Sequence, residues 1–134
     1  MTSNAKPVPD RGPLPKPSDP DEAREYLKAS AFPAPAVQTV TMTALEFTSV
    51  CPRTGQPDFG TVTIDYEPTE KCIESRALKY YLWSYRDEPA FVETVAARIA
   101  DDVVYAIDPT YVEVVVTQNM RGGIEIVATA SRPA

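Results

Sequence analysis

A thiol and a carboxyl group stand seven positions apart in a short turn-forming run, Cys51 to Asp58 (CPRTGQPD). Two prolines and a glycine between them indicate a stiff loop that presents both groups. A soft nucleophile with a proton donor beside it suits covalent catalysis, and Arg53 could favour the thiolate. The alternative is a small apolar residue at the end of a strand, followed by an ordinary Pro-Asp turn.

The chain has 134 residues, two cysteines and no histidine. The lack of histidine excludes Ser-His and Cys-His catalytic pairs, and two thiols alone do not fill a zinc coordination shell, so no metal site is expected. In a reducing compartment two cysteines indicate free thiols rather than a disulfide. Proton transfer must therefore use Asp, Glu, Lys, Tyr, Cys or water.

The length fits one domain, and the net charge of −6 argues against a broad nucleic-acid surface, which would be basic. Local basic clusters could still bind a small anion. No apolar run is long enough to cross a membrane, and the polar N-terminus lacks the pattern of a signal peptide. We therefore expect a cytoplasmic protein.

Residues 1–36 are predicted to be a proline-rich tail with a possible short helix after Asp19-Pro20, and residues 37–134 a single domain. The segment 37–47 is rich in Thr and Val, and the segment 61–66 alternates apolar and polar residues, so both are predicted strands. The cysteine run joins them, which indicates an antiparallel pair.

The pattern then changes to helical periods over 73–86 and 91–107, followed by predicted strands at 111–117 and 124–129. Residues 120–123 between these strands are typical of a hairpin turn. The order predicts an α+β fold, ββααββ, with an antiparallel four-stranded sheet and two helices on one face. Two open sheet edges favour a ring-shaped homo-oligomer.

Several charged residues of these elements could bind a ligand. Arg76 and Lys79 share a helix face and could hold a phosphate, or form a solvated face with Glu74 as partner. Glu93 could accept two N–H bonds from a purine-like edge, or only complement the helix dipole. The run from Arg121 could be a ligand site or only a hairpin turn.

The cysteine run resembles a segment of the QueF-type nitrile reductases, and four further segments follow in the order seen in that family. They are IESRALKYYLWSYR from Ile73, FVET from Phe91, DPTYVEV from Asp108 and RGGI from Arg121. The resemblance extends from about Val50 to Ile126. Those enzymes use NADPH to reduce 7-cyano-7-deazaguanine (preQ0) to its 7-aminomethyl form in queuosine biosynthesis. The family has the tunnelling fold (T-fold) and assembles into rings with sites between subunits.

The resemblance implies roles for individual residues. Cys51 matches the nucleophile that forms a thioimidate with the nitrile, and Asp58 matches the acid that protonates the nitrile nitrogen. Glu93 matches the carboxylate that grips the deazaguanine, while Ser75 and Glu74 belong to the segment that lines the base pocket.

The same resemblance implies that Arg76, Lys79 and Arg121, with Gly122, hold the phosphates of NADPH. Arg76 stands where the family usually has lysine, which keeps the charge but changes the geometry. A second departure is larger: Val92 replaces the histidine that assists reduction in the family. General acid–base assistance contributes about 10²–10⁴-fold to a rate.

Three functions follow from these observations. The first is an NADPH-dependent nitrile reductase. The second is a non-reducing relative that forms an amidine, hydrolyses or removes the 7-substituent in tRNA or DNA modification. The third is a non-catalytic deazapurine-binding module. The acidic charge favours a free base over a polymeric substrate.

Overall fold

The computed structural model describes residues 15–134, so most of the predicted proline-rich tail lies outside the described residues. Its helices and strands have these bounds: α1 Pro20–Ala29, β1 Phe32–Pro33, β2 Val40–Val50, β3 Pro57–Glu67, β4 Lys71–Cys72, α2 Ser75–Trp83, α3 Val92–Ile107, β5 Tyr111–Arg121 and β6 Ile124–Arg132.

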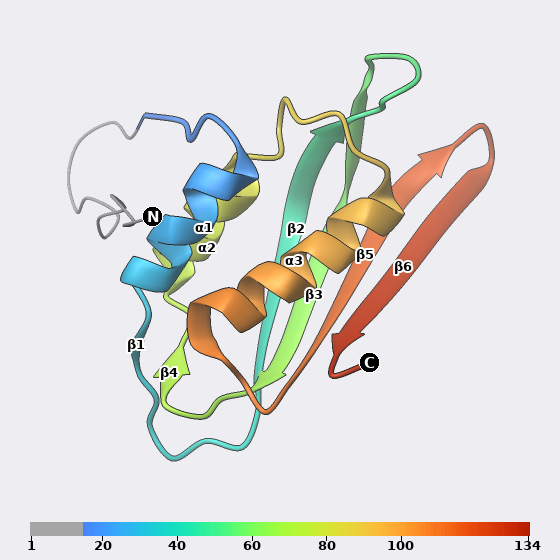
Figure 1. The fold of residues 1–134 in the computed structure, drawn as a ribbon. Coiled ribbons are helices and arrows are strands. Elements are labelled where there is room, and N and C mark those ends of the chain that lie inside the picture. Colours follow the sequence, from blue (N-terminus) through green and yellow to red (C-terminus); the bar gives the residue numbers. More distant parts are fainter. Residues whose placement is uncertain (1–14) are drawn as a thin grey trace.

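The predicted α+β arrangement is confirmed. Strands β2, β3, β5 and β6 form an antiparallel sheet in that spatial order, and the helices cover one of its faces (Figure 1). The short strands β1 and β4 form a separate antiparallel pair. The long strands β2 and β6 are the edges of the four-stranded sheet.

The alternation of side chains explains which face of the sheet is covered. Val62, Ile64 and Tyr66 of β3 are buried towards the helices, and their neighbours on the other face are only partly buried. Gly60 permits the close approach of β5, because a Cβ there would lie 2.0 Å from the carbonyl oxygen of Thr117.

Helix α3 ends where the sequence predicts and begins one residue later, with Phe91 as its N-cap, and it packs on β5 and β6. Helix α2 is shorter than the predicted 73–86, because the side chain of Glu74 caps its N-terminus and a turn follows Trp83. The turn between β5 and β6 is also as predicted: Gly122 and Gly123 both have positive φ, which suits a two-residue hairpin.

Helix α1 starts at the predicted Asp19-Pro20 cap, and Asp19 accepts a hydrogen bond from the backbone N–H of Glu22. The helix packs against α2 and α3, and its Ala23 and Leu27 are fully buried. Packing therefore extends across the predicted boundary at residue 36, and that boundary itself stays a prediction.

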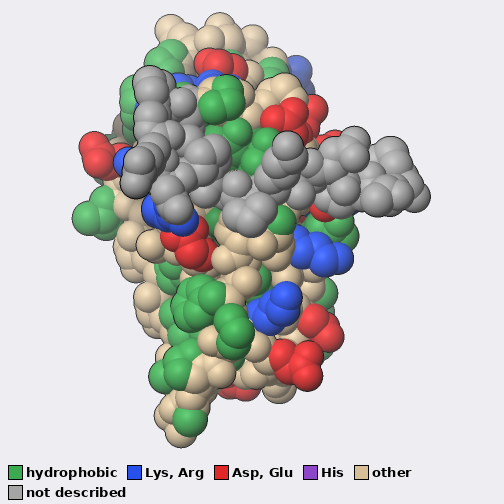
Figure 2. All heavy atoms as spheres, turned by 90° about the vertical axis from the view of Figure 1, so that its left-hand side faces the viewer, with side chains coloured by type: hydrophobic (Ala, Val, Ile, Leu, Met, Phe, Trp, Pro, Cys, Tyr) green, Lys and Arg blue, Asp and Glu red, His purple; other side chains and the backbone are tan. Residues whose placement is uncertain are grey.

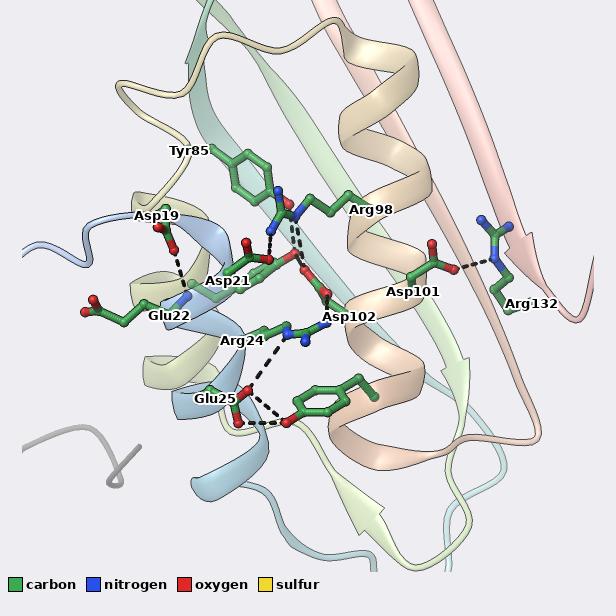
Figure 3. A network of polar contacts seen from close by, with 12 residues as sticks. Asp19, Asp21, Glu22, Arg24, Glu25, Tyr85, Arg98, Asp101, Asp102 and Arg132 are labelled. Atoms are coloured by element: carbon green, nitrogen blue, oxygen red, sulfur yellow. Dashed lines mark hydrogen bonds and ion pairs between the residues drawn. The ribbon is translucent and has the colours of Figure 1, made fainter. Parts of the chain in front are cut away.

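A group of polar contacts joins α1 to α3 (Figure 3). Arg24 and Arg98 both pair with the buried Asp102 of α3, and Asp102 also accepts a hydrogen bond from Tyr81 of α2. In a partly buried contact, Tyr105 of α3 donates to Glu25 of α1. These contacts fix the three helices relative to one another.

Strands β3, β5 and β6 are longer than predicted and β2 is shifted towards the cysteine loop, and these differences matter for the site. Strand β2 continues to Val50, and β3 begins at Pro57, so only residues 51–56 remain as a loop. No helix within residues 15–134 is long and apolar enough to span a membrane.

Candidate functional site

The cysteine loop is closed by backbone hydrogen bonds. The N–H of Cys51 donates to the carbonyl of Gln56 at 2.9 Å, and the N–H of Gly55 donates to the carbonyl of Cys51 at 2.9 Å. Gly55 has φ +72°, a conformation that favours glycine. The loop thus has a defined shape, and it leaves the Cys51 side chain partly exposed without a disulfide.

The thiol of Cys51 is poised to ionise near neutral pH. Hydrogen bonds from the Thr54 hydroxyl and from the backbone N–H groups of Thr54 and Arg53 lower the pKa of Cys51 from 9.0 to about 7. Burial and the charge of Asp58 oppose this shift and are smaller. Because the thiolate is the nucleophile, the loop itself activates this residue.

A Thr54→Val variant is expected to raise the pKa of Cys51 towards 9.0, because it removes the hydroxyl that contributes most to the shift. In the native chain the thiolate fraction falls from about half at pH 7 to roughly a tenth at pH 6. Alkylation of Cys51 by iodoacetamide, followed by mass spectrometry across pH, should therefore have a midpoint of about 7, which Thr54→Val moves upward. Thr63→Val on β3 is the matched control, and an unchanged midpoint in Thr54→Val would contradict the assignment.

Asp58 lies on strand β3 rather than on the loop, which corrects the prediction that one stiff loop carries both groups. It pairs across the ladder with Ser49 of β2, two residues before Cys51, and its side chain is 8% exposed. Its carboxylate accepts from the guanidinium of Arg121, which also donates to the side chain of Gln56 at 2.8 Å. Asp58 therefore belongs to the same end of the sheet as Cys51.

The segment before α3 is hydrogen-bonded to the end of β2, next to the cysteine loop. The N–H of Val50 donates to the carbonyl of Glu88 at 3.1 Å, and the N–H of Ala90 donates to the carbonyl of Val50 at 3.1 Å. This double contact holds Glu93, exposed in the first turn of α3, near the residue that precedes Cys51.

Val92, for which the resemblance implies a histidine in the family, is 6% exposed. It lines a small cavity of about 10 Å³ together with Ser49, Asp58 and Gln118. A valine side chain has no proton to donate or accept, so Asp58 is the titratable group that lines this cavity.

Glu74 and Ser75 lie at the opposite end of the domain. The N–H of Ile73 donates to the hydroxyl of Tyr66 at 2.9 Å, and Tyr66 is eight residues along β3 from Asp58, a separation of about 26 Å. Glu74 is also occupied, since its carboxylate accepts from the backbone N–H groups of Arg76 and Ala77. Burial raises the pKa of Glu74, but hydrogen bonds from Arg76 and Ala77 outweigh it, so the pKa is lowered.

A large groove of about 1050 Å³ runs between β2 and α2. Its lining includes three cations of α2 and the following turn, Arg76, Lys79 and Arg86, together with Trp83 and Ser75. Arg76 also pairs with Glu74 at 3.0 Å. The lining follows β2 from Thr41 to Thr48, three residues before Cys51, so the groove extends from the start of α2 towards the cysteine loop and combines positive charge with aromatic surface.

The structure thus brings Cys51, Asp58, Arg121 with Gly122, and the start of α3 together, and it places Arg76 and Lys79 in the groove. Sequence reasoning missed Thr54 and Gln56, which it treated as turn residues. The spacing of Thr54 three positions after Cys51, ahead of a glycine, was the available signal, because such a turn can return a hydroxyl to the thiol.

Comparison with known proteins identifies relatives of this chain. Residues 57–134 match the family model described as QueF-like protein. The NADPH-dependent 7-cyano-7-deazaguanine reductase of Anaeromyxobacter sp. (strain Fw109-5) is 53% identical over 98 residues, covering 71% of this chain and 80% of that protein. The reductase of the same name from Nitrosospira multiformis is 45% identical over 111 residues, covering 81% of this chain and 76% of that protein.

A solved structure is also similar. The apo crystal structure of the archaeosine synthase QueF-Like superposes with a TM-score of 0.69 at 26% identity, covering 72% of this chain and 95% of that one. The family model matches more than half of the chain, and the relatives share about half of their aligned residues with it. The chain belongs to the QueF-like protein family.

Proposed function

We propose that this protein is an NADPH-dependent reductase of 7-cyano-7-deazaguanine that acts through a thioimidate on Cys51. The observation that carries the proposal is the activated thiol, whose pKa is lowered to about 7 beside the buried carboxyl group of Asp58. The names of relatives that are about half identical support the substrate and the cofactor.

The covalent step adds the thiol across the nitrile. The sulfur of Cys51 bonds to the nitrile carbon, one C–N π bond breaks to leave a C=N double bond, and the proton lost by sulfur is matched by a proton gained by nitrogen. Asp58 relays that proton, since its carboxyl group lies on the strand paired with the one that precedes the cysteine. Bound NADPH would supply two hydrides to the former nitrile carbon, and each hydride must be matched by one proton taken up by nitrogen. The C–S bond breaks after the first hydride, which releases the thiol of Cys51 and leaves an imine for the second.

The remaining site residues have roles in this proposal. Glu93 accepts N–H groups of the deazaguanine, and Ser75 and Glu74 line the base pocket. Arg76 and Lys79 bind the phosphates of NADPH in the groove beside β2. Arg121 and Gly122, predicted for the same phosphates, lie at the Asp58 end of the sheet, and their contact with the cofactor stays a prediction.

We further propose that each site forms between two chains of a ring. Within one chain, Ser75 follows Ile73, whose N–H donates to the Tyr66 hydroxyl, and Tyr66 is about 26 Å along β3 from Asp58. That separation is too large for Ser75 and Asp58 of one chain to contact the same bicyclic base. The sheet edges also carry exposed apolar side chains, Leu45 on β2 and Ile124 and Val127 on β6. Pairing of an edge with a second copy would cover them.

Mixed rings test the shared site. Ser75→Leu should reduce kcat/KM for preQ0 about tenfold, because it removes a hydroxyl and fills the pocket. Cys51→Ala should be inactive. When the two variants are unfolded and refolded together, about a quarter of the sites should regain both native residues, so activity exceeds the mean of the separate variants. Activity equal to that mean would show that each site is built from one chain.

The substrate is proposed to be a free base in the cytoplasm. The net charge is −6, and on the face shown in Figure 2 basic and acidic side chains are interspersed rather than gathered into one basic patch. Binding a polymeric nucleic acid would favour such a patch.

NADPH oxidation followed at ~340 nm with preQ0 present tests the reductase proposal. We expect preQ0-dependent oxidation and a product with the mass of the 7-aminomethyl compound. An absence of turnover at high enzyme concentration would exclude reduction. A Cys51 adduct in the same sample would still support formation of the thioimidate.

A second candidate is a non-reducing enzyme in which ammonia attacks the thioimidate and gives an amidine. Two points favour it: the resemblance implies that Val92 replaces a histidine of the reductases, and a similar solved structure is an archaeosine synthase. Mass spectrometry of products formed from preQ0 and ammonia without NADPH separates the two candidates, because the amidine forms only in the second.

A further inference from the structure

Arg121 connects strand β5 to the cysteine loop. It is the last residue of β5, and the register that pairs Gly60 with Gln118 brings it alongside the start of β3. Its Nη1 donates to the carboxylate of Asp58, and its Nη2 donates to the side-chain oxygen of Gln56 at 2.8 Å. Both ends of the guanidinium fork are therefore bonded to residues at the end of the loop.

These contacts lead directly to the nucleophile. Gln56 links the two residues. Its side chain accepts a hydrogen bond from Arg121, and its backbone carbonyl accepts a hydrogen bond from the N–H of Cys51. Asp58 is 6% exposed, and its buried carboxylate keeps a fixed orientation because the planar guanidinium that donates to it is held by a second contact with Gln56. The Arg121 side chain is itself 35% exposed, so it borders solvent at the mouth of the site.

We propose that Arg121 is a positioning residue for the covalent step: it holds Asp58 and the cysteine loop in register, before and independently of any cofactor. The inference rests on the proposed thioimidate at Cys51. It differs from the phosphate-binding prediction for Arg121, because the bonded groups lie within the chain and the addition of sulfur to a nitrile consumes no NADPH.

The test measures the rate at which preQ0 forms an adduct on Cys51 in the absence of NADPH, by intact-protein mass. Arg121→Gln should slow adduct formation about tenfold to hundredfold, the cost of a displaced reacting group. Arg121→Lys keeps the charge but lacks the planar fork that fixes the geometry of both contacts, so its rate should be intermediate. Arg132→Gln, which removes a similar Arg–Asp pair at the far end of the sheet, is the matched control and should react at the native rate.

Two further measurements separate positioning from a general loss of structure. The alkylation midpoint of Cys51 should stay about 7 in Arg121→Gln, because the hydrogen bonds that lower the pKa come from Thr54 and Arg53. In an Asp58→Asn background, Arg121→Gln should slow the adduct less than it does in the native chain, because the two residues act as a unit.

The outcomes are distinct. Adduct formation at the native rate in Arg121→Gln overturns the inference, and a raised KM for NADPH in that variant would then assign Arg121 to the cofactor alone. The inference is also overturned if Arg121→Gln slows adduct formation by the same factor in the native chain and in the Asp58→Asn background. A native chain that forms no adduct with preQ0 refutes the proposed function instead.

Discussion

A Cys51→Ala chain should form no adduct with preQ0 and should lose turnover by at least about 10⁴-fold, the scale seen when a covalent nucleophile is removed. The thiolate that the loop stabilises has no substitute, because alanine has no nucleophilic atom and the second cysteine is 3% exposed at Cys72. Intact-protein mass and NADPH oxidation measure the two losses in one sample.

Cys72→Ala is the matched control for that experiment. Cys72 lies in β4 and packs in the core, so the change should cost about 1 kcal/mol of unfolding free energy and leave the adduct on Cys51. Turnover that survives in Cys51→Ala would rule out the covalent route. Loss of the adduct in Cys72→Ala would show that the adduct forms on Cys72 and not on Cys51.

Asp102→Ala should destabilise the fold by about 3 kcal/mol, because it leaves polar groups of all three helices without their shared partner. Asp102 is 2% exposed and binds Arg24 of α1, Tyr81 of α2 and Arg98 of its own helix. The two arginines border solvent and can be hydrated, which keeps the expected cost at the lower end for a broken buried pair. Urea unfolding measures the change in free energy.

The neighbouring residue provides a control for Asp102. Asp101 pairs with Arg132 at 2.8 Å, but its side chain is 64% exposed, so Asp101→Ala should cost less than about 0.5 kcal/mol. Figure 3 shows the two carboxylates on successive positions of α3, one towards α1 and one towards β6. Equal losses in the two variants would show that burial of the pair does not set its contribution.

The sequence determined the local elements of this protein, because their signals are short-range. The four-residue period from Phe91 predicts α3, the alternation over 61–66 predicts β3, and adjacent glycines predict the last hairpin. Asp19 before Pro20 fixes the start of α1. Strand ends were less accurate, because pairing across the ladder, not propensity, decides where β2 and β5 stop.

The candidate site depended on both levels. The type and spacing of Cys51 and Asp58 suggested covalent chemistry, and the resemblance of the surrounding segments suggested the substrate. Periodicity did not reveal that α1 packs into the core or that Glu74 caps α2. The same local sequence would fit a solvated tail in place of a packed α1, and a solvated Glu74 carboxylate in place of a helix cap. Only the contacts seen in the structure distinguish these alternatives.

Only the tertiary structure decided which distant groups meet. Arg121 is 63 positions from Asp58, and the antiparallel register of β3 and β5 brings the two side chains into contact. The same strands carry Tyr66, and with it the start of α2, to the far end of the sheet, which separates Ser75 from Cys51 within one chain. Residue types define what chemistry a site could perform, but strand order and register set the distances on which that chemistry depends.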